Sequence, residues 1–129
     1  MIADKKRILY IEDNPENRLL ALRILMAEGY DVALAATGIE GLTIAEKDRP
    51  DLILVDINMP ELDGYTVTTK LKEMPHLKYV PVIALTANVM RGDREKTLAA
   101  GCDGYLQKPI DIDTFTQEIA RFIEEAQRP

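Results

Sequence analysis

Five polar side chains with complementary chemistry stand where short apolar runs of this sequence end. Glu12 and Asp13 come directly after the first run, and Asp56 comes directly after the third. Thr86 ends the fourth run, and Lys108 closely follows the fifth. If these runs are parallel strands, their carboxyl ends meet at one edge of a sheet, where open α/β sheets bind ligands. The sequence therefore predicts three carboxylates, a hydroxyl and an ammonium group at one site.

The chemistry of this set follows from its charges. Three carboxylates within a few ångströms repel one another, and a hard divalent cation removes that conflict. Mg²⁺ prefers one or two carboxylates together with waters and a phosphate, and a strand-end carbonyl near Asn58 could add an oxygen ligand. Lys108 supplies a fixed positive charge, and Thr86 supplies a hydrogen-bond donor. The combination suits a carboxylate nucleophile, Asp56, that accepts a phosphoryl group.

The apolar runs alternate with longer segments of helical character. Several of them are continuous rather than alternating, as expected for strands that are covered on both faces. The predicted strands occupy residues 8–11, 31–35, 52–55, 80–85 and 104–106. Five alternations of strand and helix predict a doubly wound α/β domain with a parallel sheet and helices on both sides.

Punctuating residues place the helices between these strands. Asn14 as cap and Pro15 at the first helical position start a helix that runs to about residue 28, where Gly29 closes it. Further helices are predicted after Thr37-Gly38, over about 64–73 and over about 88–100. The last helix has an apolar period of 3.6 residues, and either Asp111 or Asp113 can cap it.

The first helix is apolar around nearly its whole circumference. Its apolar residues are Leu19, Leu20, Leu22, Ile24, Leu25 and Met26. Because one side of a helix in a two-sided α/β domain must face outward, this pattern favours a face kept for a partner. The alternative is that a few exposed leucines are ordinary on a protein surface.

Composition excludes several classes of function. The chain has 129 residues, enough for one domain, and its net charge of −6 argues against broad contact with nucleic acid or an anionic membrane. No apolar stretch approaches the roughly 20 residues that span a bilayer. The single cysteine, Cys102, excludes an internal disulfide framework, and we expect a cytoplasmic protein.

Taken singly, each candidate residue has an ordinary structural explanation. The Glu12-Asp13 pair can be a solvated loop or helix cap, and Asp56 a turn former. Thr86 can cap a helix, and Lys108 can be a surface lysine. All of them fall at strand ends on the same side of the predicted sheet, which makes independent coincidence a poor explanation. His76 and Cys102 do not fall at a predicted strand end with other reactive side chains. We interpret His76 as a surface residue and Cys102 as a packed residue.

Five motifs, in order along the chain, resemble those of the receiver domain of two-component response regulators. They are Tyr10-Ile-Glu-Asp-Asn14, Asp51-Leu-Ile-Leu-Val-Asp56, Met59-Pro-Glu-Leu-Asp-Gly64, Pro81-Val-Ile-Ala-Leu-Thr-Ala87 and Gly104-Tyr-Leu-Gln-Lys-Pro109. The resemblance covers essentially the full chain. It implies the flavodoxin-like receiver fold with five helices and strand order 2-1-3-4-5.

The resemblance also implies residue roles. Asp56 would be the phospho-acceptor, and Lys108 would contact the phosphoryl group ahead of a cis peptide to the next proline. Mg²⁺ would be held by Asp13, Asp56 and the Asn58 backbone, with Glu12 acting through a water. Thr86 and Tyr105 would form the switch pair, in which the hydroxyl moves toward phosphate and the ring turns inward.

The partners that the resemblance implies are a sensor histidine kinase or histidine phosphotransfer protein upstream and a protein effector downstream. Helix one would dock the phosphodonor, and the surface of helix four, strand five and helix five would signal. We expect a single receiver domain of the stand-alone type over residues 1–129. We expect no enzyme activity beyond slow autophosphorylation and autodephosphorylation.

A receiver module of a hybrid histidine kinase is the alternative. A haloacid dehalogenase-type phosphatase is the rival enzyme, but by resemblance it needs an acid/base Asp where this chain has Asn58.

Overall fold

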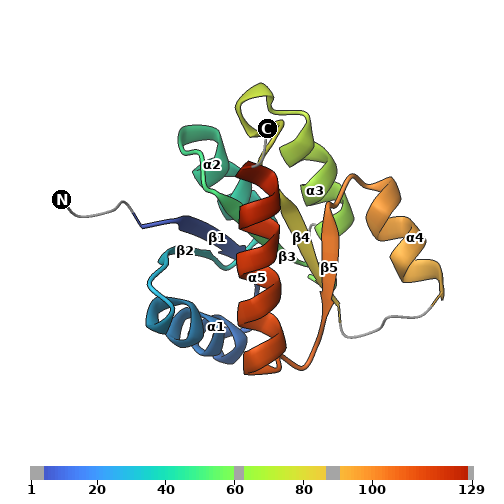
Figure 1. Ribbon diagram of the computed structural model, residues 1–129. Helices are drawn as coiled ribbons and strands as arrows, with labels where there is room; N and C mark the ends of the chain where they lie inside the picture. The colour runs from blue at the N-terminus through green and yellow to red at the C-terminus, as the bar shows by residue number, and fades with distance from the viewer. Residues whose placement is uncertain (1–4, 60–62, 87–90, 128–129) are drawn as a thin grey trace.

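In the computed structural model, five parallel strands form one sheet that carries helices on both faces (Figure 1). The structure describes residues 5–59, 63–86 and 91–127. The strands lie in the order β2-β1-β3-β4-β5, which confirms the predicted doubly wound topology. Their bounds are β1 Arg7–Ile11, β2 Asp31–Ala35, β3 Leu52–Asp56, β4 Val82–Thr86 and β5 Gly104–Gln107.

Two apolar layers enclose the sheet, and alternate strand residues supply them. Ile8 and Tyr10 of β1 pack with α1 and α5 on one face, whereas Leu9 and Ile11 pack on the other face with α2 and α3. Burial on both faces explains why the strands are continuously apolar in sequence. The helices are α1 Pro15–Ala27, α2 Gly38–Lys47, α3 Gly64–Lys72, α4 Arg91–Ala99 and α5 Ile112–Gln127, with a short 3₁₀ turn, η1, at Pro75–Leu77.

The predicted caps of the first and last helices are in place. The Asn14 side chain accepts hydrogen bonds from the backbone N–H groups of Glu16 and Asn17. At α5 the choice between two aspartates is resolved, because the Asp111 carboxylate accepts from the N–H groups of Asp113 and Thr114. These bonds satisfy amide groups that have no partner within the helix.

The fourth strand begins later than predicted, at Val82 rather than at residue 80. The N–H of Val80 donates to the Leu77 carbonyl oxygen in the turn that follows η1, and Pro81 has no N–H to give to a ladder. Strands three and five each extend one residue beyond prediction, to Asp56 and Gln107. The helix predicted over 88–100 is observed as Arg91–Ala99, and residues 88–90 lie outside the described part of the chain.

Helix α1 has the outward apolar surface that its sequence suggested. Ala21, Ile24 and Leu25 are buried against the sheet. Leu19 and Leu20 are 46% and 43% exposed, and Met26 further along is 60% exposed. Two adjacent exposed leucines beside the buried stripe are consistent with a partner face.

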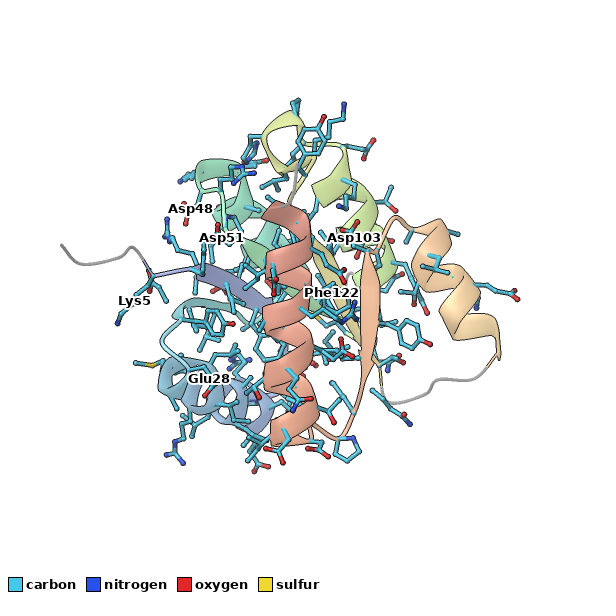
Figure 2. The ribbon with its side chains drawn as sticks, in the orientation of Figure 1. Lys5, Glu28, Asp48, Asp51, Asp103 and Phe122 are labelled. Carbon is cyan, nitrogen blue, oxygen red and sulfur yellow. The ribbon has the colours of Figure 1, made fainter. Side chains whose placement is uncertain are left out.

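The amino-terminal edge of the sheet is held by an ionic contact that is remote from the predicted site. Arg7 at the start of β1 forms an ion pair with Asp48, and its backbone N–H donates to the Asp51 carboxylate. Figure 2 shows Asp48 and Asp51 beside the start of β1. These bonds fix the loop before β3 beside β1. Among the described residues, no helix is both long and apolar enough to cross a membrane.

Candidate functional site

The site lies where the strand order reverses, between β1 and β3. In that parallel pair Ile11 aligns with Val55, so Glu12 and Asp56 emerge side by side at the carboxyl edge. From this point α1 starts on one face of the sheet, and the connection from β3 leads to α3 on the other (Figure 1). This switch point is the position at which open α/β sheets bind ligands.

Glu12, Asp13 and Asp56 form a compact acidic cluster. A carboxylate oxygen from each of the three lies within 4.8 Å of the others. Glu12 is fully buried and Asp56 is 2% exposed, whereas Asp13 faces solvent. Burial of two like charges beside a third is unfavourable unless the cluster is compensated.

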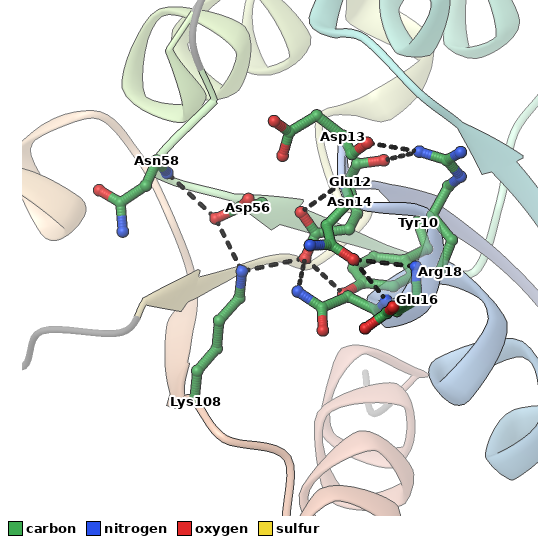
Figure 3. Close-up of polar contacts among 10 residues, drawn as sticks. Tyr10, Glu12, Asp13, Asn14, Glu16, Arg18, Asp56, Asn58 and Lys108 are labelled. Carbon is green, nitrogen blue, oxygen red and sulfur yellow. Dashed lines mark hydrogen bonds and ion pairs between the residues drawn. The ribbon is translucent and has the colours of Figure 1, made fainter.

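Lys108 partly compensates the cluster from the loop after β5. Its Nζ lies 2.9 Å from Glu12 Oε1 and 3.2 Å from Asp56 Oδ1, so one ammonium bridges two carboxylates (Figure 3). Burial acts to lower the pKa of Lys108, but the hydrogen bond to Glu12 and the charges of Asp56 and Glu12 outweigh that effect. The pKa of Lys108 is therefore raised, and the ammonium stays charged.

Asp56 is held in one orientation by its local backbone. The N–H of Asn58 donates to Asp56 Oδ1 at 3.0 Å, in the turn that follows β3. Gly64, the first residue of α3, packs closely behind this turn. A methyl group at Gly64 would stand 2.5 Å from the Asp56 carbonyl oxygen and 2.7 Å from Ile57 Cα. The sequence placed Gly64 at a helix start and at the end of one of the five motifs, but its close approach to the turn is visible only in three dimensions.

Glu12 is anchored by residues that the sequence analysis did not assign to the site. The Tyr10 hydroxyl donates to Glu12 Oε1 at 3.1 Å, and the Asn17 side-chain amide donates to the same oxygen at 3.2 Å. Burial and the Glu12 charge raise the pKa of Tyr10 far above its usual value, so the phenol keeps its proton. Two-residue strand periodicity does place positions 10 and 12 on one face, which was the available signal.

The acidic loop is also tied to α1 through its backbone. The Arg18 guanidinium donates to the carbonyl oxygens of Glu12 and Asp13, at 2.8 and 2.9 Å. Together with the Asn14 cap, this contact fixes the first turns of α1 against the acidic pair (Figure 3).

The remaining predicted residues occupy neighbouring positions. Thr86 ends β4 one residue beyond Leu85, which pairs with Asp56, and it is 3% exposed. Tyr105 lies deeper along β5, opposite Ala84, and packs against a small buried cluster that contains Ile57. The peptide between Lys108 and Pro109 is cis, as the resemblance implied.

Two other sequence candidates have structural roles. Cys102 is buried, and this burial raises the pKa of its thiol, which donates to Thr68 Oγ1 at 3.5 Å. His76 is exposed in η1, and its Nε2 lies 2.6 Å from the Ala45 carbonyl oxygen. Neither residue contacts the acidic cluster.

The donor set of the cluster fits a hard divalent cation. All three side chains offer carboxylate oxygens, and the bridging Lys108 leaves their summed charge negative. Oxygen-only sites with one or two carboxylates and room for water are the kind that Mg²⁺ occupies. A cation held by Asp13, Asp56 and nearby oxygens would complete the charge balance.

Comparison with known proteins gives consistent results. The family model for the response regulator receiver domain matches residues 8–120. The polar-differentiation response regulator DivK of Brucella anthropi is 40% identical over 121 residues, which cover 94% of this chain and 98% of that protein. The DivK protein of Brucella ovis is 39% identical over the same length.

Solved structures show the same similarity in three dimensions. The receiver domain of the sensor histidine kinase PA1611 from Pseudomonas aeruginosa, described with a magnesium ion in its active-site cleft, has a TM-score of 0.87 and 40% identity. The alignment covers 94% of this chain and 99% of that one. The Vibrio cholerae chemotaxis protein CheY4 has a TM-score of 0.89 and 28% identity, over 92% of this chain and 99% of that one.

The close approach of Gly64 predicts a steric effect. Gly64→Ala places a methyl group against the backbone of the Asp56 turn, and overpacking of this kind costs about 1–3 kcal/mol. We expect a lower free energy of unfolding by urea denaturation, although Gly→Ala at a helix start would otherwise be mildly favourable. Unchanged or increased stability would show that the turn yields without strain.

The charge balance predicts that Asp13→Asn raises the stability of the metal-free protein but reduces its stabilisation by Mg²⁺. Asp13→Asn removes one of three like charges, so the metal-free protein should gain about 1 kcal/mol of stability. Mg²⁺ at about 100 times its Kd should stabilise the wild type by about 2.7 kcal/mol, and Asp13→Asn much less. Thermal unfolding with and without Mg²⁺ measures both effects, with the exposed Glu46→Gln as control. Equal stabilisation of Asp13→Asn by Mg²⁺ would exclude Asp13 as a ligand.

Proposed function

Because this chain belongs to the response regulator receiver domain family, we propose that its phospho-acceptor is Asp56. The chain is a signalling switch controlled by phosphorylation, and such domains work with histidine kinases or phosphotransfer proteins and with downstream effectors. The specific proposal is that Asp56 takes a phosphoryl group from a phosphohistidine. In this step a carboxylate oxygen of Asp56 bonds to phosphorus, the phosphorus–nitrogen bond breaks, and its electron pair returns to the imidazole.

The observation that carries this proposal is the environment of the Asp56 carboxylate. Both hydrogen-bonding contacts reach the same oxygen, Oδ1, from the Asn58 N–H and from Lys108 Nζ. Among the described residues, Oδ2 receives no such bond, which leaves it as the nucleophile. Lys108 is already beside the acceptor and would neutralise the charge that the phosphoryl oxygens bring.

We propose Mg²⁺ as the cofactor, held by Asp13, Asp56 and the Asn58 backbone, with Glu12 acting through a water. The support is the all-oxygen acidic cluster and the magnesium ion named in the similar PA1611 receiver domain. When bound, the ion supplies positive charge that screens the incoming phosphoryl group from the carboxylates.

Transmission of the signal is proposed to involve Thr86 and Tyr105. Thr86 stands at the same sheet edge as Asp56, on the adjacent strand. Tyr105 packs on β5 with Ile57, which follows Asp56 in the chain. A hydroxyl drawn toward the phosphoryl group would leave space for the Tyr105 ring to turn inward, which would alter the surface of β5 and its neighbouring helices for a protein effector.

Enzyme activity is proposed to be limited to slow autophosphorylation and slow loss of the phosphoryl group. A haloacid dehalogenase-type phosphatase would need a carboxylate acid/base two positions after the nucleophile. This chain has Asn58 there, and an amide cannot exchange a proton with water in that role.

We propose that residues 1–129 form one receiver domain that works in the cytoplasm. The family match over residues 8–120 and the single sheet support one domain. The cytoplasm is proposed because histidine kinases use ATP to form the phosphohistidine, and ATP is a cytoplasmic substrate. A stand-alone regulator is favoured by the DivK relatives. A receiver of a hybrid kinase is the alternative, because the PA1611 domain is equally similar.

The acceptor assignment predicts the loss of labelling in one conservative variant. With acetyl phosphate and Mg²⁺, the wild type should become phosphorylated, and Asp56→Asn should not, because an amide oxygen is a poor nucleophile. Intact-protein mass spectrometry measures the added phosphoryl group. Asp31→Asn, at the start of β2 and therefore at the amino-terminal end of the strands, is the control and should label normally. Undiminished labelling of Asp56→Asn would refute the assignment.

The exposed leucines of α1 predict that a charge on this helix slows phosphotransfer from a protein donor but not from a small-molecule donor. Leu20→Glu should slow phosphotransfer from the cognate phosphohistidine protein about tenfold or more, because a charge replaces an apolar contact at a docking surface. Labelling by acetyl phosphate, which needs no docking, should not change. Radiolabel transfer kinetics test this, with Leu98→Glu on α4 as control. Equal transfer rates for Leu20→Glu and wild type would show that donors dock elsewhere.

A further inference from the structure

We propose that Tyr10 and Asn17 are positioning residues that fix the Glu12 carboxylate and so set the affinity of the acidic cluster for Mg²⁺. The inference rests on the proposed function, in which Glu12 belongs to the metal site. It adds two residues that do not themselves touch the ion or the phosphoryl group.

The geometry around one oxygen atom is the basis of this inference. Glu12 Oε1 accepts hydrogen bonds from the Tyr10 hydroxyl at 3.1 Å, Asn17 Nδ2 at 3.2 Å and Lys108 Nζ at 2.9 Å. The donors come from β1, α1 and the loop after β5, so they approach from three elements. Among the described residues, Oε2 accepts one longer bond, from the Asn14 N–H at 3.4 Å. One oxygen is thus pinned, and the other is left for the cluster.

Each donor constrains Glu12 differently. Lys108 also contacts Asp56, so it can follow either carboxylate and does not by itself fix Glu12. Tyr10 is a fully buried strand residue, and Asn17 lies on a helix whose start is held by its cap and by Arg18. Two donors on rigid elements therefore fix the position of Glu12 Oε1, and Lys108 remains able to shift toward an incoming group.

The choice of tyrosine at this position also indicates a specific role. Tyr10 belongs to the apolar layer between the sheet, α1 and α5, which Ile8 of the same strand fills with hydrocarbon alone. A buried phenol needs a partner for its hydroxyl, and here that partner is a carboxylate of the site. Hydrogen bonds from outer residues to metal-site carboxylates orient them and tune metal affinity.

The test compares Mg²⁺ binding by the wild type, Tyr10→Phe and Asn17→Ala, measured by isothermal titration calorimetry at fixed pH on the full chain. Removal of outer donors commonly weakens metal binding 10- to 100-fold, and because Glu12 is proposed to act through a water we expect about three- to tenfold for each variant. Tyr79→Phe removes an exposed hydroxyl and should bind Mg²⁺ like the wild type. Thermal unfolding shows that each variant is folded, and Asn17→Ala, on the helix surface, keeps the test valid if Tyr10→Phe is unstable.

A double-mutant cycle separates positioning from general damage. In a Glu12→Ala background, which removes the accepting oxygen, adding Tyr10→Phe should not weaken Mg²⁺ binding further. Equal weakening in both backgrounds, or wild-type affinity in Tyr10→Phe and Asn17→Ala, would overturn the inference while the metal site itself stands. A wild type that does not bind Mg²⁺ would overturn the proposed cofactor, and this inference with it.

Discussion

Like charges forced together at a buried sheet edge are the constraint on which the structure of this site depends. Parallel β1 and β3 deliver Glu12 and Asp56 side by side, and Asp13 follows immediately. One ammonium, Lys108, bridges the two buried carboxylates and leaves the cluster with an excess of negative charge. A group that adds positive charge stabilises this arrangement, and a group that modifies Asp56 changes its balance. The function of the domain follows from that sensitivity.

The fold supplies the rigidity that such a cluster requires. Apolar layers on both faces fix the strands, and the pinned turn after Asp56 and the capped start of α1 fix the loops that carry the acids. Gly64 allows α3 to begin directly against the Asp56 turn. In the proposed switch, a movement of Lys108 or Thr86 would be passed to β5 and its neighbouring helices, because the acidic loops themselves are held in place.

Sequence alone predicted the sheet and the charged residues of the site, because both depend on local patterns. Continuous apolar runs marked strands buried on two faces, and the residues after each run had to meet at one edge. Contacts between distant elements were not predictable in this way. The amide of Asn17 lay within a helix, and the late start of β4 depended on a turn at Leu77 that uses the N–H of Val80. Strand periodicity did place Tyr10 on the same face as Glu12, but it did not show that the hydroxyl bonds to the carboxylate.

The central claim is that the phosphoryl group is carried by the carboxylate of Asp56. Borohydride reduction of the protein phosphorylated by acetyl phosphate, followed by peptide mass spectrometry, identifies the modified residue directly, because an aspartyl phosphate is reduced to homoserine. The account predicts homoserine at position 56 in the phosphorylated sample and aspartate there in the untreated sample. Homoserine at position 13 or at another aspartate, with position 56 unchanged, would contradict it.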